Sequence, residues 1–235
     1  MLFRIRLNKI LTIATLTLLV ACKKDESTDR GLEDGKSVLV KDLAGDTKAS
    51  IASGIDGKEK RPFYTFLYSL EQKRQIWIRT ASDSATHLKT NTWDIAFAGN
   101  YNGEVQINNR KYEGTPGFGG PVERSAIVMI AEAYEKVTQA PADSEFDKSQ
   151  ISSIGMVGGA QSTGWYSYDM TSHIFKPYSN RTYVLRLPSG KYAKLQLVNV
   201  YKGNPPAVTD MFWPAPYLTF KYFVQADGSK NLNTN

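Results

Sequence analysis

The amino-acid sequence predicts a single all-β domain of antiparallel sheets with long loops rich in glycine and proline. The chain contains 13 tyrosines, 10 phenylalanines and 4 tryptophans, and aromatic residues are enriched in β-strands. They are spread through short segments that Gly, Pro, Asn and Asp interrupt, as expected for strands joined by turns. The sequence shows no internal repeat and no second hydrophobic block, so we expect one domain of about 200 residues.

Several segments have the composition and length of strands. They cover residues 38–43, 63–70, 75–80, 93–99, 104–108, 165–170, 182–187, 191–201 and 217–225. The clearest pair is 182–187 and 191–198, because both runs alternate in part between apolar and polar residues. The turn residues Pro188-Ser189-Gly190 lie between them. This pattern predicts a β-hairpin.

Two further segments need interpretation. Residues 125–137 place some apolar residues at helical spacing, but residues 126–130 alone suit a buried strand. We predict a strand followed by a turn. Residues 112–122 are rich in glycine and proline, and neither a strand–helix context nor a following Lys-Ser/Thr frames them as a phosphate-binding loop. We therefore predict a flexible loop.

The first 21 residues have the features of a signal peptide. The basic residues Arg4, Arg6 and Lys9 precede an apolar run, residues 10–20, that is too short to span a bilayer. The tetrapeptide that ends at Cys22 resembles the lipobox of bacterial lipoproteins, which implies cleavage before Cys22 and attachment of lipid to it.

The cleavage site divides the chain into three parts. Residues 1–21 are the signal peptide, residues 22–36 form a polar, lipid-anchored flexible tether, and residues 37–235 form the binding domain. We expect contact with the membrane through the lipid anchor only. The single cysteine is used by the anchor, so the domain has no thiolate nucleophile and no cysteine-based metal site.

Charge and motif content exclude several functions. The formal net charge is +6, and removing the three basic residues of the signal peptide leaves +3, without the Lys/Arg cluster that nucleic-acid binding needs. His87 and His173 are the only histidines, and the sequence contains neither an HExxH motif nor a Gly-x-Ser-x-Gly motif. We therefore expect a binding protein and not an enzyme, with no nucleic-acid partner.

The most informative segment for binding is residues 165–173, which contains aromatic side chains, a thioether and an imidazole: Trp165, Tyr166, Tyr168, Met170 and His173. A thioether is a soft ligand that suits haem iron or copper(I). Aromatic walls suit a flat apolar macrocycle such as haem, with Lys, Arg or Tyr at the rim for its propionates.

The other methionines differ in context. Met156 lies among glycines, which allow the backbone to approach a bulky partner closely. Met129 and Met211 are expected to fill gaps in packed regions, Met211 within a turn.

Two blocks resemble the HmuY-type haem-binding lipoproteins. The first is the pentapeptide Trp93-Asp94-Ile95-Ala96-Phe97. The second runs from Gly164-Trp165 to Arg181 and continues through Ser189-Gly190 and residues 193–196. The resemblance implies an all-β outer-membrane lipoprotein exposed on the cell surface. It also implies capture of haem for iron acquisition, with a TonB-dependent outer-membrane receptor as partner.

Members of this family hold haem iron between two side chains, His in some members and Met in others. The resemblance places Met170 at one ligand position, because it ends the Trp-x-x-aromatic-x-ligand run, with Trp165, Tyr166 and Tyr168 as pocket walls. The region that normally supplies the other ligand is shortened here, so Met156 and, alternatively, His173 are the candidates. Met ligation favours reduced iron.

A second hypothesis is a surface module that binds something other than haem. On the same β scaffold, Trp165, Tyr166, Tyr168 and Trp213 would stack on a glycan or contact a protein partner through their flat faces.

Overall fold

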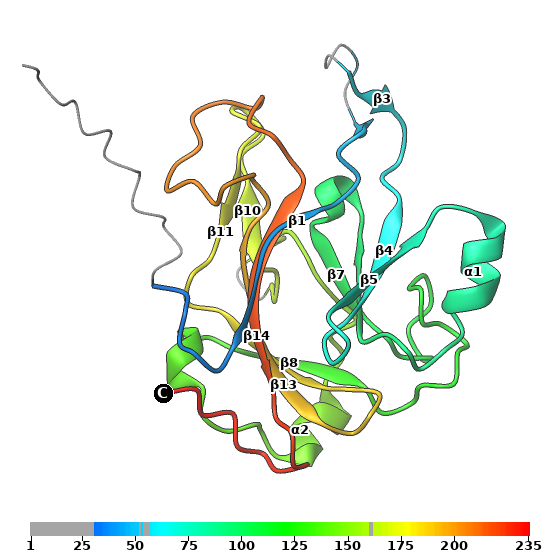
Figure 1. Cartoon of the computed structure of the whole chain (residues 1–235), viewed down its shortest axis with the longest axis vertical. Helices are drawn as coiled ribbons and strands as arrows, with labels where there is room; N and C mark the ends of the chain where they lie inside the picture. The colour runs from blue at the N-terminus through cyan, green and yellow to red at the C-terminus, as the bar shows by residue number, and fades with distance from the viewer. Residues whose placement is uncertain (1–30, 52, 54–56, 160–161) are drawn as a thin grey trace, which may run out of the picture.

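The computed structural model describes residues 31–51, 53, 57–159 and 162–235, and its core is a sandwich of two five-stranded sheets (Figure 1). The predicted signal peptide and Cys22 lie outside the described residues. The first sheet has the order β1 (Val38–Ala44), β14 (Tyr217–Val224), β13 (Tyr192–Asn199), β12 (Thr182–Arg186) and β8 (Ala126–Ile130). The second has the order β5 (Arg74–Ile78), β4 (Thr65–Ser69), β6 (Ile95–Ala98), β7 (Glu104–Ile107) and β9 (Ser153–Ile154).

Neighbouring strands run antiparallel throughout both sheets. Two smaller pairs stand outside them. The strands β10 (Tyr166–Tyr168) and β11 (Phe175–Pro177) form an antiparallel hairpin, and β2 (Ala49–Ser50) pairs in parallel with β3 (Glu59–Lys60). The predicted all-β, antiparallel fold class is therefore confirmed.

Every expected strand is present, and most are shorter at their ends. The Arg186–Tyr192 turn closes the predicted hairpin, and Gly190 adopts a φ of 83°, a conformation that glycine tolerates best. The strand predicted within residues 125–137 is present as β8, and a short 3-10 helix, η2 (Tyr134–Lys136), follows it where a turn was expected.

Three short helical segments were not predicted from the sequence: α1 (Ala81–His87), α2 (Asp143–Lys148) and the 3-10 helix η1 (Asn100–Asn102). Thr80 begins α1 with a reciprocal capping box, in which its side chain accepts from the backbone of Asp83 and the Asp83 side chain accepts from the backbone of Thr80. This cap ends the preceding strand before Thr80. None of the helices in the described part of the chain is long and apolar enough to cross a membrane.

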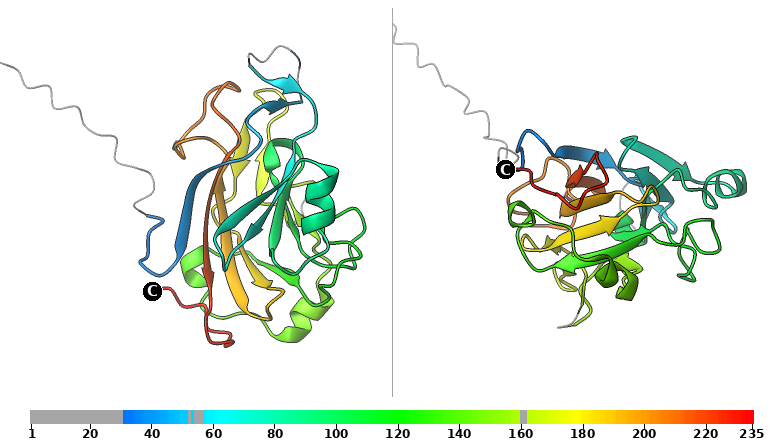
Figure 2. Two further views of the ribbon diagram at one scale, coloured as in Figure 1. Left: turned by 45° about the vertical axis from the view of Figure 1, so that its right-hand side comes forward. Right: turned by 90° about the horizontal axis from the view of Figure 1, so that it is seen from below.

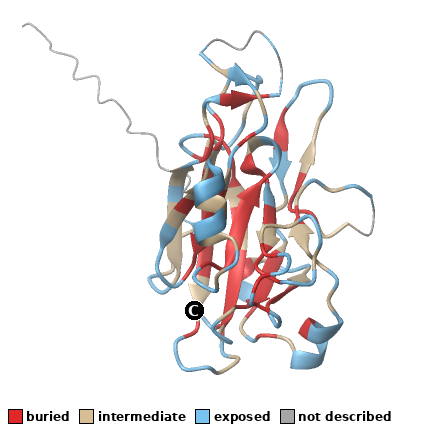
Figure 3. Ribbon diagram, turned by 90° about the vertical axis from the view of Figure 1, so that its right-hand side faces the viewer, coloured by how far each residue is buried: buried red, intermediate tan, exposed pale blue. Residues whose placement is uncertain are grey.

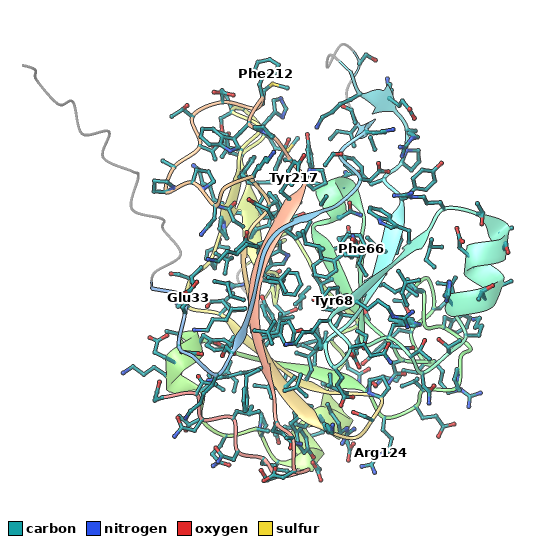
Figure 4. The ribbon with its side chains drawn as sticks, in the orientation of Figure 1. Glu33, Phe66, Tyr68, Arg124, Phe212 and Tyr217 are labelled. Atoms are coloured by element: carbon teal, nitrogen blue, oxygen red, sulfur yellow. The ribbon has the colours of Figure 1, made fainter. Side chains whose placement is uncertain are left out.

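Aromatic side chains from both sheets fill the space between them. The ring centroid of Phe220 on β14 lies 5.3 Å from that of Tyr68 on β4 and 5.4 Å from that of Phe97 on β6. Phe97 in turn stacks on Phe66 at 4.8 Å. Figure 3 shows the resulting band of buried strand residues, and Figure 4 shows Phe66 and Tyr68 between the sheets. Large rings bury much apolar area each, so this layer stabilises the sandwich.

The outer face of the first sheet carries two buried lysines. Lys194 donates hydrogen bonds to the carbonyls of Tyr134 and Val137 and to the hydroxyl of Thr234, at 3.0–3.1 Å. Burial lowers the pKa of Lys194 to about 8. Lys221 pairs with Asp34 at 2.9 Å.

These lysines hold the two ends of the described chain together. Asp34 also accepts from the backbone and hydroxyl of Ser37, and Lys36 donates to the carbonyl of Asn235 at 2.7 Å. Figure 2 shows the beginning of the described chain beside the C-terminus. Asp34 and Lys36 of the predicted tether therefore contact the domain.

The Trp-Asp pair of the first sequence block has a structural role. Trp93 is fully buried, and its indole N–H donates to the carbonyl of His87 at 3.1 Å. The Asp94 carboxylate accepts from the backbone N–H of Leu70 at 2.7 Å, at the turn between β4 and β5. Burial raises the pKa of Asp94 to about 6 from an ordinary value of 3.8.

Asp94 makes the stability of the fold pH-dependent in a defined direction. Because its folded-state pKa is raised, its contribution to the free energy of unfolding is full below about pH 4 and is lost as the pH rises through about 6. Asp94→Asn removes this titration and keeps an oxygen that accepts from Leu70. The free energy of unfolding of the variant minus that of the parent should therefore rise by roughly 2 kcal/mol between pH 4 and pH 7.

Urea denaturation of both proteins at several pH values measures this difference. The comparison cancels the titration of all other groups, so equal pH profiles would show that Asp94 is not the group responsible.

Candidate functional site

The β10–β11 hairpin carries the residues singled out in the sequence, and its tip is a tight turn. The Asp169 carboxylate accepts from the backbone N–H groups of Thr171 and Ser172, each at 2.8 Å, and His173 N–H donates to the Asp169 carbonyl at 2.8 Å. His173 adopts a φ of 58°, in the left-handed region. The chain therefore reverses between Met170 and His173.

A cavity of about 330 Å³ lies between this hairpin and the loop that follows β13. Its volume falls within the range of about 300–1,000 Å³ typical of ligand pockets. Phe212, on this loop, is labelled at the upper end of the molecule in Figure 4. The lining consists of Lys58, Tyr101, Tyr168, His173, Phe175, Val200, Tyr201, Met211, Phe212, Trp213, Pro214 and Ala215. We refer to it as the aromatic cavity.

Hydrogen bonds fix the walls of the aromatic cavity. The Tyr168 hydroxyl and Nδ1 of His173 lie 3.2 Å apart, within hydrogen-bond distance. The Tyr201 hydroxyl accepts from the backbone N–H of Phe175 at 2.9 Å, which attaches the hairpin to the end of β13. The Trp213 indole N–H donates to the carbonyl of Lys202 at 3.0 Å, which closes the loop on itself.

The charge of the cavity is one-sided. Among the described residues that line it there is no Asp or Glu, whereas Lys58 contributes an ammonium group. Lys58 donates to the carbonyl of Ala215 at 2.9 Å, and burial lowers its pKa. Burial also raises the pKa values of Tyr101, Tyr168 and Tyr201, so these phenols stay neutral. The site suits an apolar, aromatic ligand that carries an acidic group.

Of the three predicted wall residues, only Tyr168 lines the aromatic cavity. Trp165 is 1% exposed, and its indole N–H donates to the carbonyl of Gly103 at 2.7 Å. Tyr166 is 7% exposed and stacks on Phe175 with 3.4 Å between ring centroids. Both rings belong to the core between the sheets and hold the base of the hairpin. Aromatic residues in one short segment serve as core and as wall, and sequence spacing alone does not separate the two roles.

The predicted iron ligands are placed differently from one another. His173 lines the aromatic cavity, whereas Met156 and Met170 do not and are 53% and 74% exposed. Met156 forms a parallel bridge with Tyr166 at the base of the hairpin, and Met170 lies at the tip. The length of β10 therefore separates the backbones of the two methionines.

Met211 and Lys58 are among the lining residues that the sequence analysis did not assign to a site. Met211 was expected to fill a packed turn, but it lines the aromatic cavity and is 37% exposed. The run Met211-Phe212-Trp213 before a proline was a usable signal, because three large apolar residues on one loop seldom all turn inward. No local sequence pattern marks Lys58 as a cavity residue, because only tertiary contacts bring it close to Ala215.

The comparisons with known proteins agree with the sequence motifs. The profile of the HmuY protein family matches residues 64–211, which is more than half of the chain. The chain belongs to the HmuY family. The family resemblance inferred from the Trp-Asp and Gly-Trp blocks is therefore confirmed. A comparison with curated proteins finds no match.

Solved structures with similar folds come from several bacteria. An HmuY-like haem-binding candidate from Bacteroides vulgatus ATCC 8482 is 13% identical with a TM-score of 0.36, over 80% of this chain and 90% of the other. The apo HmuY analogue of Tannerella forsythia is 14% identical with a TM-score of 0.37, over 82% and 96%. Apo PinO from Porphyromonas gingivitis is 10% identical with a TM-score of 0.35, over 81% and 97%.

Gly164 sets the position of the hairpin base and gives a test of the packing. A Cβ added at Gly164 would lie 2.5 Å from the carbonyl oxygen of Gly155 and 2.8 Å from the carbonyl carbon of Met156, both backbone atoms that cannot rotate away. Gly164→Ala should therefore lower the free energy of unfolding by about 1–3 kcal/mol. Chemical denaturation measures this loss.

Gly158→Ala is the matched control, because a Cβ there meets nothing within 4 Å. Equal stability of the two variants would contradict the close approach of Gly164 to the segment that carries Met156.

Proposed function

We propose that this protein binds haem in the aromatic cavity as a carrier without catalysis, for the acquisition of haem iron. Membership of the HmuY family supports the proposal. The observation that carries it is the composition of the cavity. Aromatic walls, an imidazole and a thioether able to ligate iron, and one lysine converge there, and none of the described lining residues carries a carboxylate.

Each of these groups fits a part of haem. Rings of tyrosine, phenylalanine and tryptophan provide flat apolar surface for the macrocycle. The imidazole of His173 and the thioether of Met211 are both established types of axial ligand for haem iron. The ammonium group of Lys58 is a partner for a propionate, and the absence of acids among the described lining residues avoids repulsion.

Two ligand sets follow from the observations. The cavity favours His173 and Met211, because both side chains line it. The family motif favours Met170, with Met156 as the other ligand, and this set requires the tip of the hairpin to rearrange when haem binds. Loop rearrangements of this kind occur in a substantial minority of complexes. The proposal includes both sets, and the variants below distinguish them.

The cellular setting is also part of the proposal. The Leu19-Val20-Ala21-Cys22 sequence supports a lipid anchor at Cys22 and a lipoprotein of the outer membrane that faces the cell surface. Such a carrier would pass haem to a TonB-dependent outer-membrane receptor. The membrane contact would be made by the lipid alone.

One observation favours a second function, the binding of a glycan or protein partner. Phe212 is 73% exposed beside the mouth of the aromatic cavity. An exposed flat ring is a common contact for sugars and protein surfaces.

Haem titration of the purified protein tests the function and the ligands together. We expect a saturable shift of the Soret band, which His173→Ala and Met211→Ala weaken or alter because each removes an iron ligand. Met156→Ala and Met170→Ala are the matched controls, as exposed methionines outside the cavity. The reverse pattern would establish the methionine pair as the ligands.

A lack of any saturable shift in both redox states would overturn haem binding. If a glycan still bound under those conditions, the second function would stand in its place.

Lys58 gives a test of the ligand's acidic group. Lys58→Gln should weaken haem binding by roughly threefold to tenfold, because a partly buried charge pair with a propionate is lost. Binding of the dimethyl ester of the same porphyrin should not change, since the ester carries no charge. Lys60→Gln, in the exposed strand β3, is the control. Equal affinities of all three proteins for haem would show that Lys58 does not contact a propionate.

A further inference from the structure

A second and larger cavity, of about 450 Å³, lies at the other end of the sandwich. Figure 4 labels Arg124, one of its lining residues, at the lower end of the molecule and Phe212 at the upper end. The segment before β8, the end of β12 and the turn between β12 and β13 form most of its wall. We refer to it as the polar cavity.

The strand register brings Arg186 and the Arg124–Ala126 segment together. Arg186 on β12 is paired with Ala126 on β8, and its Nε donates to the carbonyl of Arg124 at 2.6 Å. The side chain of Asn109 donates to the carbonyl of Ser125 at 2.7 Å and fixes the same segment from the other side. Arg186 is 6% exposed and Ser125 is 1% exposed, so both are held rigidly in the cavity wall.

Two donors in this wall lack a hydrogen-bond partner among the residues that the structure describes. Nη2 of Arg186 pairs with Asp147 at 2.6 Å, but its Nη1 has no hydrogen-bond partner among the described residues. The hydroxyl of Ser125 likewise has none within that part of the chain. Buried polar groups are nearly always hydrogen-bonded, and an unpaired one costs about 1–3 kcal/mol. Two neighbouring unpaired donors are therefore a sign of a missing acceptor.

The acids of the wall are already neutralised. Glu123 pairs with Arg110 at 2.6 Å, and Asp143 pairs with Lys230 at 3.0 Å and accepts from the Tyr192 hydroxyl. Arg124 forms no ion pair with any residue in the described ranges. Arg186 is paired with Asp147, so the unopposed positive charge of the polar cavity comes from Arg124.

We propose that the polar cavity binds the oxyanion of a small polar ligand, a carboxylate or a phosphate group. Nη1 of Arg186 and the Ser125 hydroxyl donate to its oxygens, and Arg124 pairs with its charge. Guanidinium groups suit these planar or tetrahedral oxyanions because they present several donors in a fixed arrangement. This site is separate from the aromatic cavity and does not depend on haem binding.

The test is a titration of the purified, isotope-labelled protein with three probes: inorganic phosphate, acetate and neutral glucose. We expect saturable shifts of the amide signals of Ser125, Ser189 and Gly190 with phosphate or acetate and not with glucose. Whichever anion binds more tightly identifies the group as phosphate or carboxylate.

Variants locate the binding. Arg124→Gln and Ser125→Ala should each weaken anion binding by about tenfold, the effect expected for a charge-assisted hydrogen bond. Arg74→Gln removes the same charge at the exposed start of β5 and should have no effect. The proposal is overturned if neither anion saturates, as expected for donors satisfied by an ordered water. It is also overturned if Arg74→Gln weakens binding as much as Arg124→Gln.

Discussion

The structure depends on the aromatic layer through which the two sheets meet. Each sheet has one apolar face that must be buried, and Phe220 contacts Tyr68 and Phe97 across the interface. The Tyr222 hydroxyl adds a hydrogen bond to the carbonyl of Leu70 at 2.9 Å, which ties β14 to the end of β4. A shift of one residue in any of these strands would turn its rings outward, so the packing also sets the register.

Because rings fill the interior, the two cavities described above lie toward opposite ends of the sandwich (Figure 4). At one end the β10–β11 hairpin and the loop after β13 enclose the aromatic cavity, and at the other the β12–β13 turn borders the polar cavity. Trp165 and Tyr166 connect the core to the first of these ends, because their rings belong to the core while the next residues reach the cavity wall. The rigid layer thus positions two sites of contrasting chemistry.

Buried polar groups in this fold differ in whether their partners are present. Lys194 has three acceptors and Asp94 has the N–H of Leu70, so each stabilises a local connection and leaves nothing to a ligand. Arg186 has partners on Nε and Nη2 but none for Nη1 in the described part of the chain. Burial of Lys194 and Asp94 therefore has a structural role, whereas burial of Arg186 leaves one donor for the proposed anion.

The sequence by itself determined the fold class, the positions of the longer strands, the hairpin at Gly190 and the family, because these depend on local periodicity, turn residues and short motifs. It did not indicate the short strands β2, β3, β9 and β11. Only the tertiary structure decided which side chains share a cavity. Lys58 reaches Ala215 across 157 positions of the chain. His173 faces the cavity because Asp169 holds a turn, while Met170, three residues earlier, faces solvent. Such placements arise from contacts between distant segments, which no local pattern records.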